Sequence, residues 1–170
     1  MGGNGVRQVG GLSMNESTAK SISHGRIANE IEAGSVDACR LIRLPVFEDS
    51  RGALSFVEGG RHVPFEIARA YFLYGIPDGA KRGAHAHKAL QQLVIAIAGS
   101  FEVAMDDGRR QKVVRLDSPS VGLYICPMIW RDLLAFSRDA VCLVLASEPY
   151  DEADYFRCRD EYLAAIKERR

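Results

Sequence analysis

The chain is 170 residues long, with 47% hydrophobic and 26% charged residues, which fits one globular domain with a core of its own. Lysine plus arginine and aspartate plus glutamate both number 22, so the net charge is zero and no broad basic field favours nucleic acid. No apolar run approaches the roughly 20 residues of a membrane span. We therefore expect a cytoplasmic protein with neither a nucleic-acid nor a membrane partner.

The first 25 residues are rich in glycine, serine and asparagine and carry no signal-peptide pattern, so a flexible tail is expected over 1–25. A short helix is predicted over Arg26–Ala33 and a single domain over 38–170. The four cysteines are widely spaced and form no C-x-x-C pair, which indicates reduced, buried residues rather than a disulfide framework.

From Ala38 onward, short apolar and β-branched runs alternate with turn formers, which is typical of an all-β sandwich or barrel. The predicted strands are Cys39–Pro45, Gly52–Val57, Ile67–Tyr74, His85–His87, Gln92–Ala98, Ser100–Asp106, Gln111–Leu116, Gly122–Ile125 and Ala140–Ala146.

Turn and cap signals complete this outline. Asp107-Gly108 suits a tight hairpin, because glycine adopts a positive φ without a Cβ clash. Asp151 is predicted to cap a C-terminal helix whose apolar stripe is formed by Tyr155, Tyr162, Leu163 and Ile166.

The pattern His85-Ala86-His87 is the strongest chemical signal in the chain. In a strand, residues i and i+2 point to the same face, so the two imidazoles would enter one space. Such a pair can bind a metal or transfer protons, since histidine titrates near neutral pH. Two ordinary, solvated strand histidines are the alternative.

An H-x-H pair, a following acid and a third histidine form the metal site of cupin barrels, and this chain resembles that layout. The expected acid, however, is replaced by Gln91 or Gln92, and the expected third histidine by Arg131 or Asp132. A divalent ion generally needs three or four protein ligands, and a guanidinium repels it. We therefore expect no metal and no other cofactor.

Several motifs, in the right order, resemble the sugar 3,4-ketoisomerase family of WxcM-like bacterial cupins. The resemblance covers about Leu44 to the C-terminal helix and rests on Asp49–Gly52, Tyr71–Tyr74, Arg82–Lys88, Leu116–Pro119, Val121–Tyr124, Val144–Ser147 and Tyr150–Tyr155. It implies a double-stranded β-helix (jelly-roll) barrel with a short C-terminal helix, a homodimer, and an isomerase that works without metal. The implied reaction moves the keto group of dTDP-4-keto-6-deoxy-glucose from C4 to C3, in deoxysugar biosynthesis for surface polysaccharides such as lipopolysaccharide O-antigen.

The resemblance also implies roles for individual residues. His85 matches the proton acceptor, and His87 matches a second histidine that relays the proton or protonates C4. The predicted substrate-binding residues are Arg51 and Arg82 for the diphosphate, Lys88 as a point charge, Tyr71 for stacking of the pyrimidine, Arg82 or Tyr124 at the enediolate oxygen, and Arg131.

The chain departs from the family pattern at Ala84, at Tyr71-Phe72 and at Trp130-Arg131, where the family carries Trp-His. An inward-facing Arg131 would lower the pKa of the neighbouring imidazoles by like-charge repulsion. Two alternatives follow: a non-catalytic nucleotide-sugar-binding cupin, or a nucleotide-sugar epimerase. The epimerase would require a His-Asp dyad with a tyrosine acid, and the sequence shows no such pairing near His85.

Overall fold

The computed structural model describes residues 34–169, so the tail predicted over 1–25 and the helix predicted over Arg26–Ala33 lie outside the described residues. The described part is dominated by two five-stranded antiparallel sheets. The first sheet contains, in spatial order, β1 (Arg40–Arg43), β9 (Val121–Ile125), β6 (Gln92–Ala98), β11 (Val141–Ala146) and β4 (Arg69–Leu73).

The second sheet is built around the strand that carries both predicted histidines. Its spatial order is β12 (Tyr155–Phe156), β5 (Arg82–His87), β10 (Trp130–Leu134), β7 (Phe101–Asp106) and β8 (Gln111–Leu116). The remaining elements are the hairpin of β2 (Val46–Asp49) and β3 (Gly52–Ser55), the 3-10 helix η1 (Glu152–Asp154) and the helix α1 (Arg159–Glu168).

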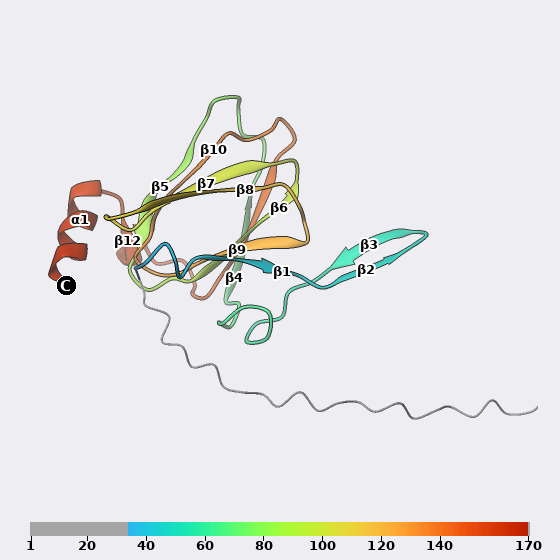
Figure 1. The fold of residues 1–170 in the computed structure, drawn as a ribbon, viewed down its shortest axis with the longest axis horizontal. Helices are drawn as coiled ribbons and strands as arrows, with labels where there is room; N and C mark the ends of the chain where they lie inside the picture. The colour runs from blue at the N-terminus through green and yellow to red at the C-terminus, as the bar shows by residue number, and fades with distance from the viewer. Residues whose placement is uncertain (1–33, 170) are drawn as a thin grey trace, which may run out of the picture. The chain divides into compact units, whose positions relative to one another are not determined.

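The core lies between the two sheets, which face each other in Figure 1. In β7 the residues alternate, so Phe101, Val103 and Met105 are buried while the residues between them are half-exposed. In β6 the residues Leu93–Ala96 are all buried, because this central strand is covered on both faces. The predicted all-β class with a short C-terminal helix is confirmed.

The predicted outline needs correction at several places. The strands β2, β10 and β12 are not among the predicted ones; β2 pairs with β3 around the Asp49–Gly52 turn, and β10 pairs with β5 and β7. Asp151 caps η1 by accepting a bond from the Ala153 amide at 2.9 Å, whereas α1 begins only at Arg159. Tyr155 therefore lies in β12, and the helix buries Tyr162 and Ile166 against the second sheet.

The predicted hairpin at Asp107-Gly108 is confirmed, and it joins β7 to β8. Gly108 adopts a φ of 80°, and the Asp107 carboxylate accepts the amides of Arg109 and Arg110 at 2.9 and 2.8 Å. The structure also shows no helix within residues 34–169 that is long and apolar enough to cross a membrane.

Candidate active site

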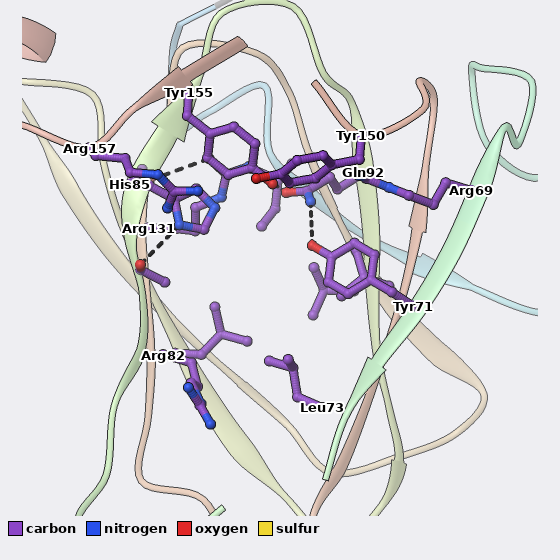
Figure 2. Close-up of a pocket in the computed structure, with 15 residues that line it drawn as sticks. Arg69, Tyr71, Leu73, Arg82, His85, Gln92, Arg131, Tyr150, Tyr155 and Arg157 are labelled. Carbon is purple, nitrogen blue, oxygen red and sulfur yellow. Dashed lines mark hydrogen bonds between the residues drawn. The ribbon is translucent and has the colours of Figure 1, made fainter. Parts of the chain in front are cut away.

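A cavity of about 520 Å³ opens between the two sheets, with side chains from both of them pointing into it (Figure 2). Its wall is apolar in the middle and polar or aromatic at one end. The lining residues are Arg69, Tyr71, Leu73, Arg82, Gly83, His85, Gln92, Val94, Ile125, Arg131, Leu133, Val144, Tyr150, Tyr155 and Arg157.

His85 reaches this cavity because β5 is irregular just before it. Gly83 has a φ of 93°, and a Cβ there would lie 2.6 Å from the backbone oxygen of Arg131, so only glycine allows β10 to approach this closely. The register between the two strands shifts between Arg131 and Asp132. This bulge directs the His85 imidazole into the cavity.

The hydrogen bond of His85 determines which of its nitrogens is basic. Nδ1 lies 2.9 Å from the carbonyl oxygen of Gly83 and must donate, since a carbonyl only accepts. Nε2 of the neutral ring is then unprotonated. Burial, followed by repulsion from Arg131, lowers the pKa of His85 to about 4, so the ring is neutral at pH 7 and able to accept a proton.

His87 lies behind His85 and is 1% exposed, and it does not line the cavity. The two rings have centroids 4.9 Å apart in an edge-to-face arrangement. Nδ1 of His87 donates to Oδ2 of Asp154 at 2.8 Å, while its buried Nε2 has no hydrogen-bond partner in the described part of the chain. The expectation that no His-Asp pairing lies near His85 is therefore wrong.

Arg131 is 2% exposed and borders the cavity next to His85. Its guanidinium donates to Oε1 of Gln92 and to the carbonyl oxygens of Ile129 and His85 at 3.2 and 3.4 Å. Within residues 34–169 it forms no ion pair with a carboxylate. Burial lowers its pKa to about 10, so it stays charged at pH 7, and the predicted like-charge effect on the imidazoles is confirmed.

Tyr71 continues this polar row, because its hydroxyl accepts a bond from Nε2 of Gln92 at 2.8 Å. The hydroxyl hydrogen of Tyr71 is therefore not used in that bond and can be donated into the cavity. Burial raises the pKa of Tyr71, which keeps the phenol protonated. The guanidinium of Arg69 lies 5.3 Å from the centre of the Tyr71 ring.

The predictions missed a group of side chains at the polar end of the cavity. Arg69 also lies over the ring of Tyr150 at 5.5 Å, and Arg157 lies over the ring of Tyr155 at 4.3 Å. The ring of Tyr155 is 4.2 Å from that of His87 and 5.1 Å from that of His85. The motif Tyr150–Tyr155 carries this signal, but the sequence pattern places Tyr155 in a helix capped by Asp151.

His85, Tyr71, Arg82 and Arg131 all line the cavity, with Arg82 at the opposite end from the other three (Figure 2), but three other predicted residues lie elsewhere. Tyr124 is buried outside the lining, and its hydroxyl donates to Oε1 of Gln91 at 2.7 Å. Lys88 donates to the carbonyl oxygen of Ala153 at 2.6 Å on the exterior. Arg51 lies at the tip of the β2–β3 hairpin, where it pairs with Asp49.

Potential metal ligands do not gather at this site. Within residues 34–169 no three histidine, cysteine, aspartate or glutamate side chains are grouped as metal ligands. Around His85 the cavity instead presents the Arg131 guanidinium and the Gln92 amide. This donor set is poorly suited to a divalent cation, because a buried positive charge repels it.

Comparison with known proteins assigns the chain to a family. Residues 37–167 match the family model described as FdtA: WxcM-like, C-terminal. The chain is 42% identical over 130 residues, 75% of this chain and 94% of the relative, to a TDP-4-oxo-6-deoxy-alpha-D-glucose-3,4-oxoisomerase of Aneurinibacillus thermoaerophilus.

Two solved structures agree with this match. QdtA, a sugar 3,4-ketoisomerase from Thermoanaerobacterium thermosaccharolyticum in complex with TDP, has a TM-score of 0.75 and 40% identity over 77% of this chain and 96% of that one. WlaRB, a TDP-quinovose 3,4-ketoisomerase from Campylobacter jejuni, has a TM-score of 0.72 and 41% identity over 74% and 97% of the two chains. The chain therefore belongs to the FdtA, WxcM-like family, as its sequence motifs predicted.

Proposed function

We propose that this protein is a sugar-nucleotide 3,4-ketoisomerase that converts dTDP-4-keto-6-deoxy-glucose into the 3-keto sugar without a metal. The observation that carries this proposal is that one cavity holds both an unprotonated Nε2 of His85 and the buried side chain of Arg131. Within residues 34–169 no carboxylate forms an ion pair with this arginine. The names and ligands of the relatives, a TDP-4-oxo-6-deoxyglucose oxoisomerase and a TDP-bound ketoisomerase, support the choice of substrate.

The first half of the reaction uses both groups. The C4 carbonyl acidifies the hydrogen on C3, so Nε2 of His85 removes that proton while the electron pair moves to the C4 oxygen. The developing oxyanion is stabilised by a cationic donor, and we assign this role to Arg131 instead of the predicted candidates Arg82 and Tyr124. The Tyr71 hydroxyl is a second donor at this end of the cavity.

In the second half, the intermediate collapses in the opposite direction. The proton on the C3 oxygen passes to the C4 oxygen as the C3 carbonyl forms, and C4 accepts a proton from the His85 imidazolium, whose N–H exchanges with solvent. The atoms therefore balance without any external oxidant or reductant, and His85 returns to its neutral form. A neutral His85 before and after the cycle is consistent with its low pKa.

The nucleotide is expected to bind at the polar end of the cavity. Arg82 lies at the opposite end of the cavity (Figure 2), but Arg69 and Arg157 line the polar end, and guanidinium groups bind diphosphate oxygens through paired hydrogen bonds. The aromatic faces of Tyr150 and Tyr155 lie beside them for a pyrimidine. Tyr71 was predicted for this stacking, but its hydroxyl bonds to Gln92, which Arg131 also contacts, so we assign it to the sugar instead.

We also propose a homodimer, supported by the β2–β3 hairpin that extends away from the sheets in Figure 1. All its residues are exposed, including Phe47 at 64% and Leu54 at 59%. The strand β4 is an edge of the first sheet and carries an exposed Phe72. If the hairpin of a second copy packed on this edge, both exposed surfaces would be buried. Arg51, which does not line the cavity of its own chain, would then lie closer to the cavity of the other copy.

In its biological setting, we propose a cytoplasmic enzyme of deoxysugar biosynthesis for surface polysaccharide. The single domain predicted over 38–170 and the tail over 1–25 remain predictions. Sugar nucleotides are charged molecules, which agrees with a cavity lined by guanidinium groups.

One experiment tests the proposed activity. The protein is incubated with dTDP-4-keto-6-deoxy-glucose in deuterated buffer after dialysis against a chelator, and the sugar is analysed by NMR. We expect a 3-keto product with deuterium at C4. A stoichiometric transition metal in the purified protein, with activity erased by the chelator, would overturn the metal-free mechanism.

The same experiment separates two alternatives. The pair of His87 and Asp154 beside Tyr155 is the observation that favours an epimerase, which would place deuterium at C5 without moving the ketone. Tight binding with neither product nor label would identify a non-catalytic binding protein.

A further inference from the structure

Asp154 makes three contacts that join the C-terminal segment to the end of β5. Its Oδ1 accepts the amide of Ala89 at 2.7 Å, and its Oδ2 accepts Nδ1 of His87 at 2.8 Å. Its backbone oxygen accepts the amide of Lys88 at 2.8 Å. Both carboxylate oxygens are therefore held in place, although Asp154 is 67 residues away from His87 in the chain.

This arrangement fixes the proton on the His87 ring. A carboxylate oxygen only accepts, so the neutral imidazole must carry its proton on Nδ1. The lone pair on Nε2 is then left on the side of the ring away from Asp154. Because this nitrogen is buried and has no partner in the described residues, the interior holds an unused acceptor beside His85.

We propose that Asp154 is a positioning residue for the isomerase, which acts by holding His87 in the tautomer with a free Nε2 next to the catalytic base. When His85 takes the proton from C3 it becomes an imidazolium ion between Arg131 and His87. A lone pair on its neighbour, backed by a carboxylate, stabilises that cation, whereas an N–H bond in its place would repel it.

The segment that carries Asp154 also carries Tyr155 and Arg157, both of which line the cavity. The contacts of Asp154 therefore hold this segment in place, which positions Tyr155 and Arg157 in the cavity wall and also sets the tautomer of His87. This explains why the two histidines and the C-terminal motif belong to one functional unit.

The first test is NMR on the full protein labelled with 15N in histidine, with the His87 signals assigned by their loss in His87→Gln. In the wild-type protein we expect His87 to be protonated at Nδ1 and bare at Nε2. In Asp154→Asn, the amide oxygen keeps the Ala89 bond and the NH2 group faces His87, so the proton is expected to move to Nε2.

The second test is kinetic and rests on the proposed function. With dTDP-4-keto-6-deoxy-glucose, Asp154→Asn is expected to lower kcat on the order of 100-fold, with KM changed by less than about twofold. Asp151→Asn is the matched control, because this residue caps η1 three positions earlier, asparagine caps equally well, and its carboxylate bonds to Ala153 rather than to His87. Its kcat should equal that of the wild-type protein.

A double-mutant cycle distinguishes positioning from mere support of the fold. If Asp154 acts through His87, Asp154→Asn lowers kcat no further when His87 is already glutamine. Additive losses in the double variant, or a wild-type His87 protonated at Nε2, would overturn the proposal. If the wild-type protein shows no isomerase activity, the proposed function fails, while the NMR result still decides the role of Asp154.

Discussion

The cavity wall and the β2–β3 hairpin each present an arginine that the sequence predicts to bind the substrate, and the two lie in opposite environments. Arg131 is buried and bonded only to an amide and to carbonyl oxygens, whereas the side chain of Arg51 is 87% exposed and paired with Asp49. Water and the Asp49 carboxylate screen Arg51, so its charge has little electrostatic effect on neighbouring groups. Arg131 is unscreened, and its field acts on both imidazoles.

The comparison predicts that the largest effect comes from the base that faces Arg131. His85→Asn should lower kcat by about 1,000-fold or more, because asparagine cannot accept a proton at neutral pH. Affinity for TDP, measured by calorimetry, should stay within a few fold. Turnover near the wild-type rate would show that His85 is not the base.

Removal of the buried cation itself should have the next largest effect. Arg131→Gln is expected to lower kcat about 100-fold through the loss of a donor to the oxyanion. It should also raise the pKa of His85, so the acid limb of the kcat/KM profile, expected near pH 4 in the wild-type protein, should move toward neutral pH. An unmoved acid limb would contradict the electrostatic part of this account.

On the hairpin, apolar contact rather than charge should dominate. Phe47→Ser is expected to weaken the proposed dimer on the order of 100-fold, because Phe47, which is 64% exposed in the single chain, would be buried in the interface of each copy. Sedimentation velocity over a dilution series measures this shift. Val113→Ser, at a similarly exposed valine on β8, is the control and should leave the dimer unchanged.

The buried imidazoles should also make stability depend on pH. Burial lowers the pKa of His87 to about 2 from an unfolded value near 6.5, so the unfolded chain binds more protons across this window. The stabilisation is full above pH 6.5 and declines below it, by about 2 kcal/mol at pH 5 for this residue. Urea unfolding at pH 7.5 and pH 5 measures the loss, which should be smaller in His87→Gln.

The smallest effect is expected at Tyr124, which lies outside the cavity. Tyr124→Phe removes the bond to Gln91 and should lower the free energy of unfolding by about 1 kcal/mol. Its kcat should stay within about twofold of the wild-type value. A large loss of kcat would show that Tyr124 takes part in catalysis and would contradict the assignment of the oxyanion donor to Arg131.

These outcomes bear on how far local patterns can be trusted in this chain. Alternation in a strand was enough to place His85 and His87 on one face, and the strand does have both rings adjacent. At β9 this rule carries no information, because Gly122–Ile125 are all buried and show no alternation. An entirely apolar strand does not reveal which residue faces the cavity, and Ile125 faces it rather than Tyr124.

Composition, strand periodicity and ordered motifs by themselves determined the all-β class, the family and the histidine pair, since these depend on residues near one another in the chain. Only the tertiary structure decided that His85 lines the cavity while His87 lies behind it, bonded to Asp154. It also decided that Arg131 faces inward and that, in the described residues, no carboxylate forms an ion pair with it. Finally, it placed Tyr155 in a strand beside the cavity rather than in a helix. The physical reason is that burial and hydrogen bonding between distant segments set the charge and tautomer of each group, and neither is encoded by local spacing.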